Sequence, residues 1–155
     1  MSTPLPTLPY RRSRFSTRLP LGRLYTASHY WLDAHEDGAW RVGFTKFATR
    51  MLGDLVEYRF EVEPGGAITV GQQIGWVEGF KALSEVFSVV QGGFGGVNPE
   101  LERDVTLVDS DPYRRGWLYQ ARGQAEPAAV DAQGYAAILD ATIDKMLEKQ
   151  GGGDG

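Results

Sequence analysis

Ten of the twenty glycines fall between residues 53 and 96 and divide that stretch into short apolar segments. They occupy positions 53, 65, 66, 71, 75, 79, 92, 93, 95 and 96. A glycine inside a strand weakens the strand and marks a bulge, a tight bend or a close approach of two backbones. The pattern therefore predicts a small barrel or sandwich built from short hairpins.

The run Gly92-Gly93-Phe94-Gly95-Gly96 also allows a phosphate-binding loop as an alternative. Such a loop needs a helix that opens directly after it, so that the first backbone amides point at the phosphate. Asn98-Pro99 interrupts any helix at that place. The glycine run therefore favours close strand packing over phosphate binding.

Upstream, the pattern predicts a hairpin, a short helix and a strand. Residues 25–34 and 39–44 are apolar runs joined by the turn residues 36–38. Thr45 is a suitable N-cap for a short helix that Gly53 closes. The next strand shows the clearest alternation, with apolar residues at positions 56, 58, 60 and 62 and charged residues between them.

After a last strand over residues 116–121, the apolar period becomes helical. Tyr135, Leu139 and Ile143 lie on one stripe, and Asp131 is a plausible N-cap. We expect this helix to pack on the β body. We expect residues 1–24 to form an extended or disordered Arg/Pro-rich arm and residues 25–122 to form a β domain. Residues 123–150 should form a linker and the C-terminal helix, and residues 151–155 a disordered Gly-rich tail.

The arm is basic and the remainder of the chain is acidic. Five arginines precede Asp33, and no acidic residue does, which leaves eleven basic against twenty acidic residues from Asp33 onward. An acidic body is a poor partner for a phosphate backbone, so we expect no nucleic-acid binding. The arm's prolines favour an extended segment over a mitochondrial transit helix. No apolar run is long enough to span a membrane.

The inventory of reactive side chains is small. The chain has no cysteine, which excludes thiolate catalysis and disulfides, and it has only two histidines. His29, Asp33 and His35 would share a face of one strand and could bind a metal. The polar residues around position 36 fit a solvated hairpin turn better, so no metal site is expected. Because nucleophile elbows and spaced carboxylate pairs are also missing, we expect no catalytic residue.

Lys81 stands between two apolar runs, at the expected tip of a hairpin. A lysine at a turn is usually a solvated surface charge. Here Gly65 lies 16 residues before it and Gly92 lies 11 residues after it. Glycines flanking a hairpin lysine in this way resemble those of lipoyl- and biotinyl-carrier domains.

Several segments, in order, resemble the glycine cleavage H-protein family. Residues 25–32 (YTASHYWL) are similar to its opening motif T-x-S-H-E-W-V, and residues 42–56 are similar to V-G-I-T-x-[FY]-A followed by L-G-D-[IV]-V. Residues 77–82 (VEGFKA) resemble the lipoylation motif V-E-S-V-K-A, and residues 111–118 match D-P-Y-x-x-G-W-L. The resemblance covers residues 25–149 and implies a mainly β, flattened barrel-sandwich hybrid with short helices and a C-terminal α-helix.

The resemblance also implies a function. Such a protein carries lipoate in amide linkage on the motif lysine, here Lys81, and is not itself an enzyme. It shuttles an aminomethyl group from glycine decarboxylase to aminomethyltransferase, and dihydrolipoyl dehydrogenase reoxidises the arm. The implied partners include lipoate-attaching enzymes. A monomer is expected, in the cytoplasm of a bacterium or the mitochondrial matrix of a eukaryote.

The family's pattern assigns recognition by the lipoylating enzyme to Glu78 and places Ser28 and Glu85 in a cleft near the arm. The family's glutamate in S-H-E-W is Tyr30 here, and a phenol brings no negative charge with which to hold an ammonium group. Two alternatives therefore stay open. One is a related lipoate-binding carrier that serves another pathway, such as sulfur oxidation, and the other is an interaction module that is never modified.

Overall fold

The computed structural model describes residues 5–152, which form three open β-sheets and three α-helices. The six-stranded sheet consists, in spatial order, of β3 (Leu24–Tyr25), β4 (Tyr30–Ala34), β5 (Ala39–Phe44), β11 (Tyr119–Ala125), β10 (Val90–Val97) and β7 (Ala67–Ile68). The three-stranded sheet consists of β6 (Leu55–Phe60), β8 (Gln73–Gly79) and β9 (Leu83–Phe87). The third sheet is the hairpin of β1 (Thr7–Arg12) and β2 (Phe15–Pro20). The helical elements are α1 (Lys46–Leu52), α2 (Leu107–Ser110) and α3 (Ala132–Gly152), with 3-10 turns η1 (Glu36–Gly38) and η2 (Pro99–Glu102).

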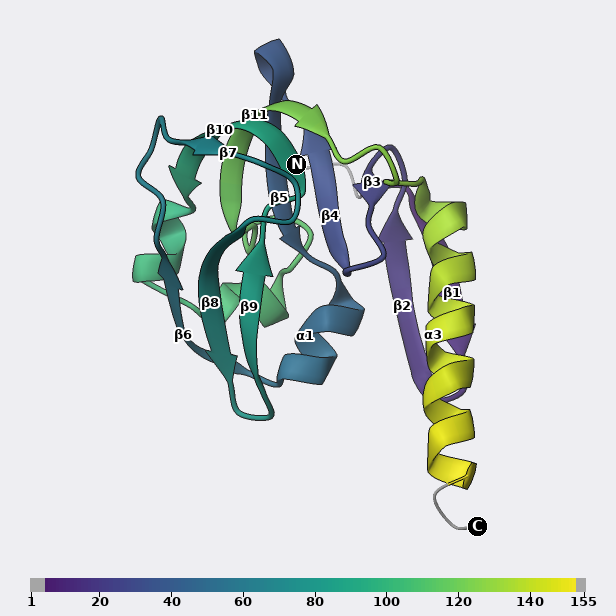
Figure 1. Cartoon of the computed structure of the whole chain (residues 1–155). Coiled ribbons are helices and arrows are strands. Elements are labelled where there is room, and N and C mark those ends of the chain that lie inside the picture. The colour runs from purple at the N-terminus through teal and green to yellow at the C-terminus, as the bar shows by residue number, and fades with distance from the viewer. Residues whose placement is uncertain (1–4, 153–155) are drawn as a thin grey trace.

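The two larger sheets stack on each other and enclose the main core (Figure 1). Leu32, Val42 and Tyr119 of the six-stranded sheet pack with Val77 and Val86 of the three-stranded sheet, and all five are buried. The predicted mainly β fold with short helices and a C-terminal helix is confirmed. Within residues 5–152, no helix combines the length and the apolar character needed to cross a membrane.

The predicted hairpin over residues 25–44 and the predicted caps of the helix after it are confirmed. β4 and β5 pair antiparallel, and η1 forms the turn, where Asp37 and Gly38 both adopt positive φ. Thr45 caps α1, since its side-chain oxygen accepts a hydrogen bond from the Ala48 amide at 3.4 Å. Gly53 ends the helix with φ near +75°.

The strand over residues 55–60 keeps its predicted face at Tyr58 and Phe60, which pack against the core, and departs from it at Val56. The pairing of β6 with β8 shifts register between Leu55 and Glu57, as a β-bulge does. Because a bulge adds one residue to one strand, the alternation changes there. Leu55 is therefore buried, while Val56 is 49% exposed.

The N-terminal arm forms a β-hairpin over residues 7–20, and this hairpin packs against α3. Tyr10, Phe15 and Leu19 of the hairpin share a second core with Tyr135 and Leu139 of α3. Tyr10 donates a hydrogen bond of 2.7 Å to Asp140, and Arg12 bonds Asp144 through two nitrogens at 2.8 and 2.9 Å. The arm, expected to be extended or disordered, is thus extended and packed over these residues.

The C-terminal helix begins where the sequence predicts and continues slightly further. The Asp131 carboxylate accepts a hydrogen bond from the Gly134 amide at 2.8 Å, as an N-cap does. The stripe of Tyr135, Leu139 and Ile143 is buried. α3 runs to Gly152, and residues 153–155 of the expected tail lie outside the described residues, as do residues 1–4 of the arm.

Candidate functional site

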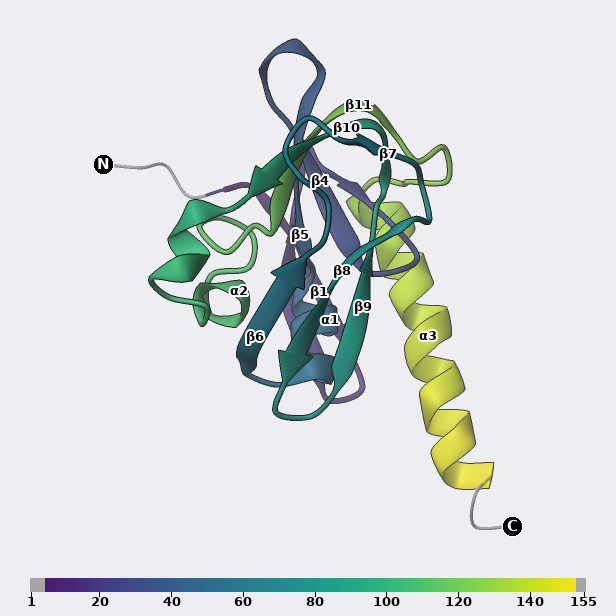
Figure 2. The same cartoon turned by 60° about the vertical axis from the view of Figure 1, so that its left-hand side comes forward.

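Lys81 lies in the turn between β8 and β9, at the end of the molecule opposite the η1 turn (Figure 2). The turn also presents Phe80, which is 79% exposed, and β9 opens with Leu83, which is 70% exposed. The lysine is itself exposed. The hairpin tip therefore exposes apolar side chains, Phe80 and Leu83, on either side of the primary amine of Lys81.

Backbone hydrogen bonds hold this turn against the end of α1. The Lys81 amide donates to the Leu52 carbonyl at 2.9 Å, and the Phe80 amide donates to the Asp54 carbonyl at 3.0 Å. Across the turn, the Gly79 amide donates to the Ala82 carbonyl at 2.9 Å. The backbone at Lys81 is thus braced, while its side chain is exposed.

Two glycines make this close approach possible. A Cβ at Gly79 would collide with the Leu52 carbonyl oxygen. A Cβ at Gly53 would lie 2.9 Å from Cγ of Lys81 and 3.0 Å from its backbone nitrogen, and Gly53 also has positive φ. Glycines at these two positions, which the sequence associated with close strand packing, therefore allow the lysine turn to pack against the end of α1.

Lys81 lines a shallow hollow of about 430 Å³ between the turn and α1. Its Nζ donates to the Arg50 carbonyl at a long 3.4 Å, and among the described residues it forms no ion pair. Asp54 and Asp109 line the same hollow, together with Lys46. Sequence reasoning missed these two carboxylates, although Asp54 lies in the L-G-D segment and Asp109 in the turn before Pro112.

Glu78 and Glu85 lie in a different hollow, on the outer face of the three-stranded sheet. That hollow measures about 690 Å³, and Trp76, Leu83 and Phe87 also line it. Trp76 stands opposite Glu85 in the pairing of β8 with β9. The structure therefore brings the two glutamates together beside an aromatic ring.

Ser28 lines neither of these two hollows. It is exposed in the turn before β4, where its hydroxyl lies 2.9 Å from the Thr26 hydroxyl.

Tyr30 points into the core and does not line the surface near the arm. It is 3% exposed, its ring stacks on Phe44 at 5.2 Å between centroids, and its hydroxyl accepts a hydrogen bond from the Phe87 amide at 3.1 Å. Burial raises the pKa of this phenol to about 12. The phenol that replaces the family's glutamate is thus a structural link between β4 and the end of β9.

The residues considered for a metal site do not converge. His29 precedes β4 with positive φ, and its Nδ1 lies 2.8 Å from the Tyr135 hydroxyl. Burial lowers its pKa to about 4. His35 instead lies with its Nε2 3.4 Å from Asp33 on the exposed η1 side. The shared strand face expected for these three residues is wrong for His29, because His29 lies in the turn before β4, while Asp33 and His35 do lie together.

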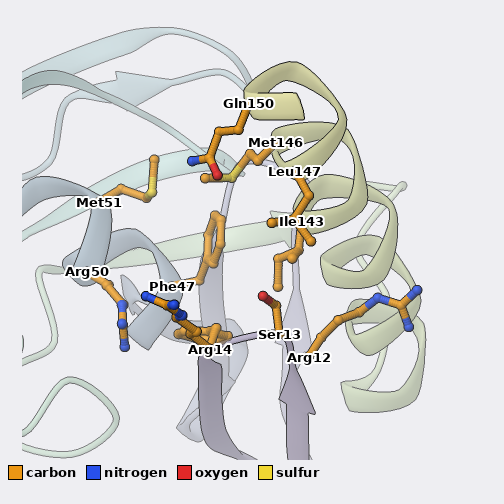
Figure 3. A pocket seen from close by; sticks show the side chains of 11 residues that line it. Arg12, Ser13, Arg14, Phe47, Arg50, Met51, Ile143, Met146, Leu147 and Gln150 are labelled. Atoms are coloured by element: carbon orange, nitrogen blue, oxygen red, sulfur yellow. The ribbon is translucent and has the colours of Figure 1, made fainter. Parts of the chain in front are cut away.

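Another groove lies beside α1 and shares Arg50 with the Lys81 hollow. It measures about 550 Å³ between the β1–β2 turn, α1 and the last turns of α3 (Figure 3). Its apolar lining comes from Phe15, Phe47, Met51, Ile143, Met146 and Leu147. Arg12, Arg14 and Arg50 add positive charge to its walls, which makes it unsuited to a cationic group.

A mainly β body that presents one exposed lysine on a braced hairpin has the architecture of a carrier domain for a covalently attached group. Comparisons with known proteins agree with that class. The family model of glycine cleavage H-proteins matches residues 23–140. The chain therefore belongs to the glycine cleavage H-protein family.

Individual relatives support the same assignment. The glycine cleavage system H protein of Shewanella sp. (strain ANA-3) is 35% identical over 127 residues, which cover 80% of this chain and 98% of that protein. The one from Kocuria rhizophila is 36% identical over 128 residues, covering 80% and 99%. The crystal structure of such a protein from Mycobacterium marinum superposes with a TM-score of 0.70 at 35% identity, covering 77% of this chain and 97% of that one. The β1–β2 hairpin and α3 beyond residue 140 lie outside the family match.

Proposed function

We propose that this chain is the lipoyl carrier of a glycine cleavage system and that Lys81 is the residue that bears the lipoyl group. The observation that carries the proposal is the setting of Lys81, an exposed amine free of ion pairs among the described residues. Its turn is held by one backbone hydrogen bond to Leu52 at the end of α1 and one to Asp54 just after it. Attachment replaces an N–H of Nζ by an amide bond to the lipoyl carbonyl, and the group that activated that carbonyl leaves with the proton. The side chain is exposed, and the hydrogen bond of Nζ to the Arg50 carbonyl is long, at 3.4 Å.

When bound, the lipoyl group supplies a disulfide that can be reduced, can carry an aminomethyl group and can be reoxidised. The chain itself contributes by holding the attachment point of the lipoyl arm in a fixed position. The braced turn keeps the root of the arm in one place, so the arm sweeps a limited volume at a high effective concentration for each enzyme that docks there. The absence of cysteine from the sequence leaves no internal thiol for exchange with the arm.

The carboxylates on the outer face of the hairpin suit a cationic cargo. Glu78 and Glu85 line a hollow there without a lysine or arginine, whereas Asp54 and Asp109 share the Lys81 hollow with Lys46 and Arg50. A carboxylate attracts an ammonium group most strongly where water is partly excluded. We assign Glu78 to recognition by the lipoylating enzyme and Glu85, with Ser28 at the edge of β4, to the surroundings of the arm.

The chain then acts as a non-catalytic, monomeric subunit. Its partners are glycine decarboxylase, aminomethyltransferase, dihydrolipoyl dehydrogenase and the lipoate-attaching enzymes, and in a bacterium it works with them in the cytoplasm.

Intact-mass measurement after co-expression with lipoylating enzymes tests the attachment. The wild type and Lys46→Arg, which changes another lysine in the same hollow, should each gain one lipoyl mass. Lys81→Arg should gain none. A gain that survives Lys81→Arg removes this residue from its proposed role, and no gain in the wild type favours an interaction module that is never modified.

The nature of the cargo needs a second experiment, because Tyr30 stands where relatives have a glutamate. Lipoylated protein should support exchange of carbon dioxide with the carboxyl group of glycine in the presence of glycine decarboxylase. A lipoylated chain that supports no exchange would instead be a carrier for another pathway, such as sulfur oxidation.

A further inference from the structure

Arg23 is a buried cation that lacks hydrogen-bond partners for at least part of its guanidinium group. The residue is 8% exposed, and its Cζ lies 4.4 Å from the centre of the Trp31 ring. Its Nη1 is fully buried and has no hydrogen-bond partner. Burial lowers the pKa of the group, with a smaller opposing influence from Asp33. Buried charges are ordinarily paired, because an unpaired one loses its hydration without compensation.

Arg41, on β5, repeats this arrangement. Its Cζ lies 4.7 Å from the centre of the Trp117 ring, and its Nε is buried without a hydrogen-bond partner. Two guanidinium groups, one from the residue before β3 and one from β5, are thus each stacked on an indole, and each has one buried N–H without a hydrogen-bond partner.

Both arginines line one hollow of about 530 Å³, and other residues of the same hollow contact its carboxylates. Asp33 lies 3.4 Å from His35, Glu100 forms an ion pair of 2.9 Å with Arg115, and Asp111 accepts the Arg115 amide at 3.2 Å. Arg114 and Arg115 also line the hollow, so that its lining holds four guanidinium groups and three carboxylates, with Arg115 paired to Glu100. None of the residues that line the Lys81 hollow lines this one.

We propose that this hollow binds the oxyanion of a small molecule, a phosphate group or a carboxylate, between Arg23 and Arg41. A planar guanidinium presents N–H groups in a fork that matches either oxyanion. Stacking on Trp31 and Trp117 holds both forks in orientation before the ligand arrives, which reduces the entropy lost on binding. The same stacking leaves little of Trp31 exposed, so the rest of the ligand extends toward the open side of the hollow.

The expected ligand is therefore recognised by its charge and geometry, with few apolar contacts. The two partnerless N–H groups are closed to solvent, so the oxyanion contacts the other N–H groups of each guanidinium. Ordered water bound to those same N–H groups would give no preference for an oxyanion over chloride.

Tryptophan fluorescence provides a direct test on the full chain, since two of the four tryptophans stack on the arginines. Inorganic phosphate and acetate are titrated separately, with sodium chloride at equal ionic strength as the reference. We expect a saturable change with one or both oxyanions and none with chloride. The titration that saturates shows whether the hollow binds a phosphate group or a carboxylate.

The matched variants are Arg41→Gln and Arg23→Gln, with Arg59→Gln as the control, because Arg59 is an exposed arginine of β6. Each of the first two should weaken binding at least about tenfold, and the control should leave it unchanged. Arg41→Gln is the decisive variant if Arg23→Gln does not fold. A response equal to that of chloride, or oxyanion binding unaffected by Arg41→Gln, overturns the proposal.

Discussion

The backbone amide of Lys81 donates to the carbonyl of Leu52 over 2.9 Å and so joins the tip of the β8–β9 hairpin to the last turn of α1. The last carbonyls of a helix have no partner within the helix. Here one of them fixes the root of the proposed lipoyl arm. The orientation of that arm therefore depends on how α1 ends at Gly53.

Gly53→Ala should disturb the lysine turn. The new Cβ would meet Cγ of Lys81 at 2.9 Å while the residue keeps a positive φ. Gly38→Ala is the matched control, because Gly38 also has positive φ but has nothing within 4 Å of an added Cβ. We expect the control to lose about 1–2 kcal/mol from the backbone conformation alone, and Gly53→Ala to lose more and to be lipoylated more slowly. Denaturant unfolding and timed intact-mass measurements compare the two, and equal losses would contradict the steric argument.

Placing the family's glutamate at position 30 should destabilise the fold of this chain. Tyr30 is 3% exposed and its hydroxyl is bonded to the Phe87 amide, so Tyr30→Glu would bury a carboxylate in the core. The expected cost is about 3–5 kcal/mol of unfolding free energy at neutral pH. Tyr30→Phe should cost only about 1–3 kcal/mol, from the amide left without a partner. Urea unfolding measures both, and a Tyr30→Glu protein as stable as the wild type would show that this side chain can leave the core.

His29 should make the fold less stable in mild acid. Its pKa is about 4 in the folded chain, against about 6.5 in an unfolded one, so the unfolded state binds more protons between these values. The free energy of unfolding should therefore fall as pH decreases from about 6.5 to about 4, by at most about 1.4 kcal/mol per pH unit. His29→Asn keeps a residue that tolerates positive φ and should remove this component of the slope. Unfolding curves at several pH values test the difference, and parallel slopes for the two proteins would exclude His29 as the cause.

The β1–β2 hairpin should depend on Phe15 for its attachment. Phe15 is 7% exposed and meets Phe47 edge-on at 5.4 Å between centroids. Phe15→Ala should cost about 3–5 kcal/mol and make the hairpin more sensitive to limited proteolysis. Arg11→Ala, an exposed change on the same hairpin, should stay within about 0.5 kcal/mol of the wild type. If cleavage of the hairpin is equally fast in Phe15→Ala and Arg11→Ala, this contact does not hold it.

Local patterns predicted most of the elements that carry the site. Alternation and turn residues predicted the hairpins around positions 36 and 81, and cap residues predicted the limits of α1 and the start of α3. These features depend on neighbours a few residues apart, which a sequence displays directly. The bulge beside Val56 was not predicted, because it depends on the register adopted against β8.

Sequence by itself determined a β-rich fold with a lysine at a hairpin tip, since periodicity, glycine placement and caps are local properties, and its motifs resembled those of a carrier family. Only the tertiary structure decided where distant side chains meet. In the folded chain Tyr30 is buried in the core, and the N-terminal hairpin packs on α3. Asp54 and Asp109 line the same hollow as Lys81, and Arg23 and Arg41 line another. Each of these outcomes depends on contacts between residues far apart in the chain, and such contacts are decided by how the sheets and helices pack together and by which buried groups find partners.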